Sequence, residues 1–146
     1  MHFHRSATVP YTAQQMYDLV NDIESYPEFL PWCSDAKIVE QTENYITATL
    51  EVSAGGLSQS FTTRNYINAP ETIEMHHIKG PFRHLKGIWT FQPLDGEQGS
   101  HIDLELTFEV ASGLKARLFS MVFNKAADKM VKSFTQRAHE LYGQKG

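Results

Sequence analysis

The residues of this chain best suited to hold a metal ion or to transfer protons are its seven histidines and its carboxylates. His2 and His4 would share one face of a strand, whereas the adjacent His76 and His77 would point to opposite faces. A protein metal site needs three or four converging ligands, and the spacing of these residues supplies no such set. We therefore expect no metal site.

Nucleophilic catalysis is not indicated either. Glycine-rich phosphate loops and the Gly-x-Ser-x-Gly elbow do not occur in the sequence. Cys33, the single thiol, has no cationic neighbour in the sequence that would make it a thiolate, so we interpret it as a small apolar residue. Asp103 and Glu105 alternate with apolar residues and are therefore expected to face solvent.

The elements that would position a site begin with a strand and a short helix. Residues 2–9 alternate between polar and apolar side chains, and Pro10 ends this predicted strand. Residues 12–15, Thr-Ala-Gln-Gln, have the spacing of a capping box, and apolar residues at helical spacing follow them. The aromatic segment 26–33 contains two prolines, so we expect at most a short helix and a loop there.

From residue 36 the apolar residues recur at every second position, which is the period of a strand. Strands are predicted from residue 36 and at 46–53, 61–67, 72–79, 84–93 and 101–110. Short turns join these six strands, and only antiparallel pairs permit such connections. With residues 2–9, the sheet has about seven antiparallel strands.

Residues 113–142 have apolar side chains at steps of three and four and are predicted to form one long helix ending at Gly143. Thirty residues extend over about 45 Å, long for a domain with an expected radius of gyration near 15 Å. Either the first turns project beyond the sheet, or the helix breaks near Asn124. A curved sheet with one apolar face would wrap around this helix, which is an α+β helix-grip fold.

Such a fold leaves a tapered interior that large side chains either fill or line. We expect fourteen apolar residues to line a ligand cavity: Phe29, Leu30, Trp32, Phe61, Phe82, Leu85, Trp89, Phe91, Leu106, Phe108, Phe119, Phe123, Met130 and Phe134. Plain core packing is the alternative for each of them. Phe29, Leu30 and Trp32 belong to the proline-restricted segment, which would either cover the cavity entrance or form a rigid corner of the core.

Four segments carry a resemblance to a known family. They are residues 20–33 (VNDIESYPEFLPWC), 61–65 (FTTRN), 80–91 (GPFRHLKGIWTF) and 134–138 (FTQRA). They resemble the START-like coenzyme Q-binding proteins and in particular their bacterial branch, the ribosome association toxins. The resemblance covers essentially the whole chain and implies a START or Bet v 1-like helix-grip fold. It also implies two roles: binding of a polyprenyl quinone such as ubiquinone in support of respiration, and binding of the large ribosomal subunit to block subunit association and translation.

Related folds include polyketide cyclases, so an enzyme is a third hypothesis. It would need a polar group inside the cavity, for which Arg64, Asn65 and His77 are the candidates. The sequence favours binding without catalysis, and no cofactor is required beyond the bound lipid itself.

The outer face of the last helix is apolar in its first half and cationic in its second. Leu114, Leu118, Met121 and Val122 lie on it, followed by Lys125, Lys129 and Lys132. The lysines contrast with residues 1–111, which carry six basic and fifteen acidic residues. This face would contact an anionic membrane surface or RNA phosphates, or it would be covered by the segment 26–33 with the lysines in solvent.

Length and composition place these elements in a single domain, residues 1–146. No apolar stretch approaches the roughly 18 residues of a membrane span, no signal peptide is evident, and one cysteine fits a reducing compartment. We therefore expect a cytoplasmic protein, with peripheral contact at the inner membrane. The acidic residues 1–111 suit an RNA partner poorly outside the outer face of the last helix, and DNA is not expected as a partner. Lipid binding is the first hypothesis and ribosome binding the alternative.

Overall fold

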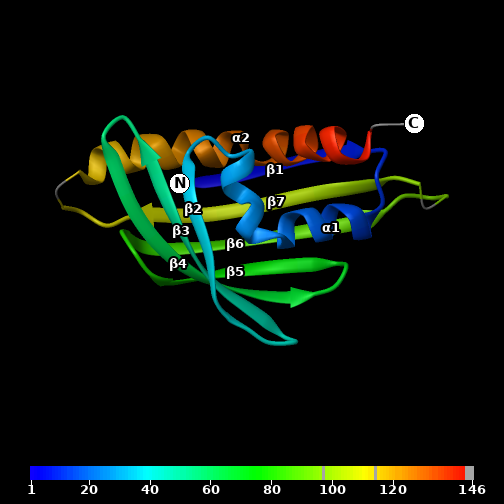
Figure 1. Ribbon diagram of the computed structural model, residues 1–146, viewed down its shortest axis with the longest axis horizontal. Helices are drawn as coiled ribbons and strands as arrows, with labels where there is room; N and C mark the ends of the chain where they lie inside the picture. Colours follow the sequence, from blue (N-terminus) through cyan, green and yellow to red (C-terminus); the bar gives the residue numbers. More distant parts are fainter. Residues whose placement is uncertain (97, 114, 144–146) are drawn as a thin grey trace.

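The structure of the chain, a computed structural model, describes residues 1–96, 98–113 and 115–143 (Figure 1). Its elements follow the predicted order of one strand, two short helices, six strands and a long helix. They are β1 (His2–Val9), α1 (Ala13–Asn21), the 3-10 helix η1 (Ile23–Glu28), β2 (Cys33–Gln41), β3 (Tyr45–Ala54), β4 (Leu57–Asn68), β5 (Thr72–Lys79), β6 (Phe82–Pro93), β7 (Ser100–Val110) and α2 (Ala116–Tyr142).

All seven strands belong to one antiparallel sheet with the order β1-β7-β6-β5-β4-β3-β2. From β2 to β7, strands that are neighbours in sequence are neighbours in the sheet, because short turns join antiparallel strands. The first strand pairs with the last one, with Phe3 opposite Leu106 and Val9 opposite Ser100. The predicted seven-stranded antiparallel sheet is confirmed.

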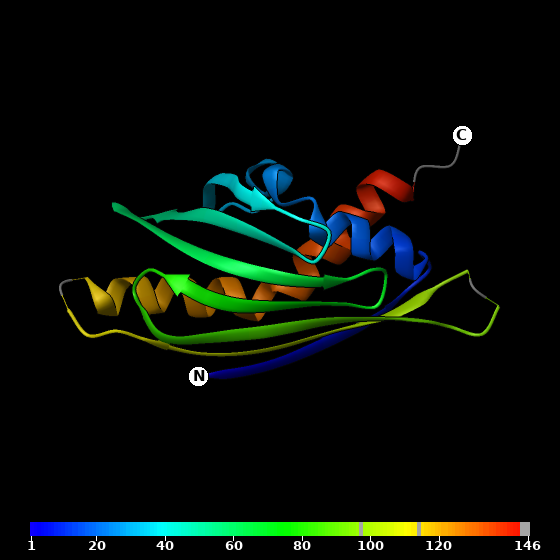
Figure 2. The ribbon, with the colours of Figure 1, turned by 90° about the horizontal axis from the view of Figure 1, so that it is seen from below.

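The sheet is curved and wraps around α2. Figure 2 shows the helix between the β1–β7 edge of the sheet and the strands β2 and β3. Along β7, Ile102, Leu104 and Leu106 are at most 3% exposed and face the helix side, whereas Asp103 and Glu105 point outward, as predicted. The apolar face is inside because the side chains of a strand alternate between its two faces. The helix-grip prediction is confirmed.

The predicted capping box begins α1. The Thr12 hydroxyl accepts the Gln15 N–H at 3.0 Å, and the Gln15 side-chain oxygen accepts the Thr12 N–H at 2.8 Å. These two bonds satisfy amides that the first helical turn leaves free. The buried face of α1 includes Met16 and Val20 and packs against β6 and β7. The helix therefore covers one end of the concave side of the sheet (Figure 1).

The long helix α2 is continuous, and the break considered near Asn124 does not occur. It begins at Ala116, three residues later than predicted, after Gly113 and Lys115 with positive φ angles of 145° and 67°. The middle of its apolar stripe is buried as predicted, whereas Ala116 and Met130 are half-buried and Leu141 is 50% exposed. Within the described residues, no helix combines the length and the apolarity needed to cross a bilayer.

Candidate functional site

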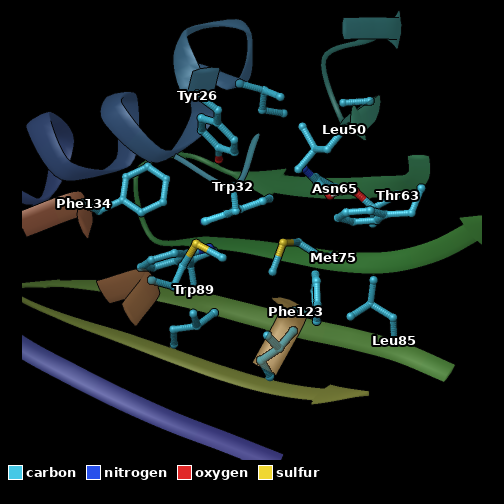
Figure 3. Close-up of a pocket in the computed structure, with 16 residues that line it drawn as sticks. Tyr26, Trp32, Leu50, Thr63, Asn65, Met75, Leu85, Trp89, Phe123 and Phe134 are labelled. Atoms are coloured by element: carbon cyan, nitrogen blue, oxygen red, sulfur yellow. Dashed lines mark hydrogen bonds between the residues drawn. The ribbon is translucent and has the colours of Figure 1, made fainter. Parts of the chain in front are cut away.

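A cavity of about 60 Å³ lies between the concave face of the sheet, α2 and the segment 23–32 (Figure 3). Its walls are aromatic, aliphatic and thioether side chains, with two polar side chains from β4. The lining residues are Ile23, Tyr26, Trp32, Ala48, Leu50, Phe61, Thr63, Asn65, Met75, Leu85, Trp89, Leu104, Leu106, Phe123, Met130 and Phe134.

The regular periods of the strands and of α2 bring these side chains together. On β4, Phe61, Thr63 and Asn65 are two residues apart and therefore point to the same side. On α2, Phe123 and Phe134 lie eleven residues apart, three helical turns, and so face the sheet along one line. The interior wall is thus built from rigid elements, which hold its side chains in defined positions.

Gly87 leaves space in the cavity wall for neighbouring side chains. Gly87 lies on β6 between the lining residues Leu85 and Trp89, opposite Met75 of β5. A Cβ atom at this position would lie 2.6 Å from the Met75 methyl carbon and 2.9 Å from Leu106 Cδ1. Position 87 therefore needs a residue without a side chain if the Met75 side chain is to lie over β6 at the cavity wall.

The polar group of the cavity is a buried pair on β4. The Thr63 hydroxyl donates a hydrogen bond of 2.9 Å to Asn65 Oδ1, and both residues are 7% exposed. Since the amide oxygen of Asn65 accepts this bond, its NH₂ group is the donor that remains for a ligand. Tyr26, also at the cavity, donates its hydroxyl proton to the Val20 carbonyl, and burial keeps the pKa of this phenol far above its usual value.

The segment 23–32 is fastened to α2 beside the cavity. Phe29 packs edge-to-face on Phe134, with ring centroids 5.2 Å apart. Arg137 lies 5.0 Å from the centre of the Phe29 ring and donates a hydrogen bond of 2.8 Å to Glu28. The aromatic contact and the charge pair together hold this segment against the helix.

Residues 9–135 match the family described as polyketide cyclase/dehydrase and lipid transport. The chain belongs to this family. It is 47% identical over 142 residues to the ribosome association toxin RatA of Pseudomonas aeruginosa, covering 97% of this chain and 98% of that protein. It is 28% identical over 149 residues to the mitochondrial coenzyme Q-binding protein COQ10 homolog B of Xenopus laevis, covering 97% of this chain and 59% of that protein.

The fold is shared with enzymes as well. The crystal structure of the Zhui aromatase/cyclase from a Streptomyces species superposes with a TM-score of 0.81, 17% sequence identity and coverage of 95% of this chain and 93% of that one. At this identity the likeness concerns the fold alone. The resemblance proposed from the four sequence segments is confirmed, because the family model matches residues 9–135 and a relative named ribosome association toxin covers 97% of the chain.

Eight of the fourteen residues expected in a ligand cavity border the cavity in this structure. They are Trp32, Phe61, Leu85, Trp89, Leu106, Phe123, Met130 and Phe134. Their elements converge on the concave face of the sheet, which is where the alternation of the strands and the stripe of α2 placed them.

Three of the other six, Phe82, Phe108 and Phe119, fill the interior instead of lining the cavity. Phe82 lies at the centre of this group, 5.3 Å from Phe119, 6.0 Å from Phe108 and 4.9 Å from Phe123. The rings meet edge-to-face and are at most 5% exposed. They form a solid aromatic core under the first turns of α2, and the cavity lies further along the helix, from Phe123 to Phe134.

The remaining three residues lie beyond the cavity walls. Phe91 packs on Tyr17 of α1 and stacks on Trp89. Leu30 is 1% exposed within the core, and Phe29 packs against α2 on the outer side of Phe134. Of the three residues expected to cover the entrance, Phe29, Leu30 and Trp32, Trp32 alone lines the cavity.

Eight lining residues were not predicted as cavity residues: Ile23, Tyr26, Ala48, Leu50, Thr63, Asn65, Met75 and Leu104. Asn65 had been considered only as a polar group for an enzyme. Its position two residues after Thr63 and four after Phe61 on one strand is the signal that places all three on the same face. For Ala48 and Leu104, the alternation of the sequence predicts that the side chains point into the interior. It does not predict which interior side chains border the cavity.

The outer face of α2 is partly covered. Leu118 and Val122 are half-buried, and Met121 is 64% exposed. The three predicted lysines Lys125, Lys129 and Lys132 are all exposed. Leu114, the fourth apolar residue predicted for this face, lies outside the described residues.

His4 and the thiol of Cys33 take structural positions. His4 hydrogen-bonds Asp103 at 2.7 Å on the outer face of the sheet, and this bond raises the pKa of His4. Cys33 is buried, and burial raises the pKa of its thiol to about 11. Across residues 1–96, 98–113 and 115–143, no three histidine, cysteine or acidic side chains gather closely enough to hold a metal ion.

Proposed function

We propose that the chain binds the ring of a quinone-type lipid such as ubiquinone in this cavity and does not convert it. The observation that carries the proposal is the buried Thr63–Asn65 pair at an otherwise apolar cavity. A quinone ring is flat and apolar and carries carbonyl oxygens, which accept hydrogen bonds. The Asn65 amide would donate to one of these oxygens, while Trp89 and Phe61 would contact the ring faces.

The cavity must widen to accept a ring. Its volume of about 60 Å³ is smaller than the roughly 150 Å³ of an apolar cavity that admits benzene. Met75 and Met130 line it, and methionine side chains adapt easily because they are unbranched and turn about three bonds. Movement of these side chains and of Trp32 would provide the space.

Binding without catalysis fits the chemistry of the walls. Among the described lining residues, none carries a carboxylate, an imidazole or an amine. The cyclisation and dehydration of polyketides require proton transfer by a positioned acid or base. Thr63 and Asn65 orient a ligand but do not titrate near neutral pH.

The replacement Asn65→Leu tests this function, with Asn68→Leu near the exposed end of the same strand as the matched control. Ubiquinone affinity would be measured by quenching of tryptophan fluorescence. Loss of one hydrogen bond corresponds to about 1–1.5 kcal/mol, or about tenfold weaker binding. We expect this loss for Asn65→Leu and unchanged binding for Asn68→Leu. Equal affinities of the folded variants would refute the role of the polar pair, and absence of quinone binding to the unmodified protein would refute the function.

Ribosome association is a second candidate function, favoured by two observations. Relatives named ribosome association toxin are 43–47% identical to this chain over nearly its full length in Pseudomonas aeruginosa, Escherichia coli and Vibrio cholerae. The exposed Lys125, Lys129 and Lys132 form a cationic row on α2, whereas residues 1–111 are strongly acidic. We propose that this row contacts phosphates of the large ribosomal subunit.

Charge reversal of the row tests this second function. Replacing Lys125, Lys129 and Lys132 with Glu should abolish co-sedimentation with large ribosomal subunits. The same change at the exposed Lys37, Lys79 and Lys86 of the sheet alters the net charge equally and serves as the control. If both triple variants lose sedimentation alike, only the net charge matters and the row is not the contact.

We propose that the protein works in the cytoplasm and reaches the inner membrane only peripherally to exchange lipid. Lysines near an anionic surface contribute about 1 kcal/mol each. Binding to vesicles with anionic lipids should therefore fall as salt is added. Salt-independent vesicle binding, or none, would contradict this localisation.

A further inference from the structure

A second, larger hollow lies on the outside of the molecule, next to the cavity. This groove has a volume of about 400 Å³ and runs between α2, the turn before β2 and the end of β3. It is lined by Pro31, Trp32, Ala54, Leu118, Met121, Val122, Lys125, Ala126, Lys129 and Ser133. Its floor is mainly apolar, and two lysines stand beside it.

Trp32 borders both the inner cavity and the outer groove. Figure 3 shows its side chain among the lining residues of the cavity, between Tyr26 and Met75. The backbone on either side is fixed, because the Trp32 carbonyl accepts the Ser53 N–H at 2.9 Å and the Cys33 N–H donates to the Leu30 carbonyl at 2.9 Å. The Trp32 indole therefore separates the cavity from the groove, while hydrogen bonds hold the backbone of this residue in place.

The volumes of the cavity and of the groove indicate that the cavity alone is too small for a lipid. Ligand sites in proteins commonly measure about 300–1,000 Å³. The cavity, at about 60 Å³, lies far below this range, whereas the groove, at about 400 Å³, lies within it. Only the cavity offers the Asn65 amide, and only the groove offers an extended apolar surface.

We infer, on the basis of the proposed lipid binding, that the groove holds the isoprenoid tail of the lipid while the cavity holds its ring, with Trp32 separating the two. The tail would cover Met121, which is otherwise 64% exposed, together with Leu118 and Val122. Covering apolar side chains with hydrocarbon is favourable because both leave water. Lys125 and Lys129 would lay their carbon stems along the tail and keep their ammonium groups in solvent.

Quinones with the same ring and different tails test this assignment. The probes are ubiquinone without a tail and ubiquinone with a two-isoprenoid tail. The groove variant combines Leu118→Glu and Met121→Glu, and the matched control Leu141→Glu changes an exposed leucine on the same helix outside the groove. Thermal melting of each variant shows whether it is folded.

For the unmodified protein and for Leu141→Glu, we expect the tailed quinone to bind at least about tenfold more tightly than the tailless one. In the groove variant this advantage should fall to about threefold or less, while the affinity for the tailless quinone stays within twofold. If both quinones bind equally to the unmodified protein, the groove assignment is wrong and the ring site stands. If neither quinone binds, the proposed function fails and the groove assignment fails with it.

The partition has a kinetic readout. Trp32→Ala joins the two compartments and should speed the release of tailless quinone by about tenfold, whereas Trp32→Phe keeps a ring in place and should change it little. Unchanged release from the folded Trp32→Ala variant would refute the partition. A groove variant that loses binding to quinone-free anionic vesicles but keeps the full tail advantage would assign the groove to a bilayer surface and overturn the inference.

Discussion

Replacing Gly87 with alanine should separate ligand binding from stability. The new methyl group would lie 2.6 Å from the Met75 methyl carbon and 2.9 Å from Leu106 Cδ1. Both atoms are ends of flexible side chains beside the cavity, so they have room to move into it. An alanine in a strand is favoured over glycine by about 0.5–1 kcal/mol, whereas overpacking a core costs about 1–3 kcal/mol.

Because the displaced side chains can move into the cavity, the cost of overpacking should be small. It should nearly cancel the gain from replacing glycine with alanine in a strand. We expect the free energy of unfolding to change by no more than about 1 kcal/mol, which corresponds to roughly 2–4 °C in Tm for a domain of this size. Ubiquinone affinity should nevertheless fall at least about tenfold, because Met75 then occupies the space for the ring.

Thermal unfolding and quenching titrations on the same preparation measure both effects. The rescue variant combines Gly87→Ala with Met75→Ala and should regain most of the lost affinity, because it removes the displaced side chain. Unchanged affinity of Gly87→Ala would show that the ring does not use the space beside Gly87. A fall in Tm of more than about 10 °C would show that the wall is too rigid to widen, which refutes the reasoning on the cavity.

Three further perturbations have defined outcomes. Trp89 is 3% exposed and contacts Phe134, so Trp89→Ala should lower the free energy of unfolding by about 3–5 kcal/mol in chemical denaturation. A near-native free energy of unfolding together with lost quinone binding would mean that Trp89 contacts the ligand and does not stabilise the core. Arg137→Ala releases the segment 23–32 and should speed quinone exchange in stopped-flow experiments. Glu140→Ala should not, since Glu140 pairs with Nη1 of this guanidinium at 3.7 Å, whereas Glu28 of the segment pairs with Nη2. Burial raises the pKa of Cys33 from 9.0 to about 11, so the thiol of the unfolded chain loses its proton at lower pH than that of the folded protein. The free energy of unfolding should therefore fall between about pH 9 and 11, and it should fall more in the unmodified protein than in Cys33→Ala.

The fold could be predicted from the sequence because each element carries a local signal that agrees with its neighbours. The alternation of 101–110 predicts β7, the Thr12–Gln15 spacing predicts the start of α1, and the stripe from Phe119 to Ala138 predicts α2. Short turns then leave only an antiparallel order for β2 to β7. These signals concern periods along the chain, which depend on the backbone.

The cavity could be predicted only in part because its boundary depends on packing between distant residues. Phe82 and Phe61 both face inward, yet Phe82 is enclosed by other rings while Phe61 borders the space. No period distinguishes the two. The opening at Gly87 is also invisible in the sequence, because it depends on how Met75 of one strand and Leu106 of another meet above it.

The pairing of β1 with β7 has a consequence for how the chain folds during synthesis. Val9 lies opposite Ser100, so the two partners are separated by 91 positions in sequence. At roughly 5–20 residues per second, the ribosome needs on the order of 5–20 s to produce the partner of a strand it made first. During that time β1 can close no native pair, and contacts of such long range slow folding. The edge of the nascent β1 strand therefore stays without its partner until nearly the whole sheet has been synthesised.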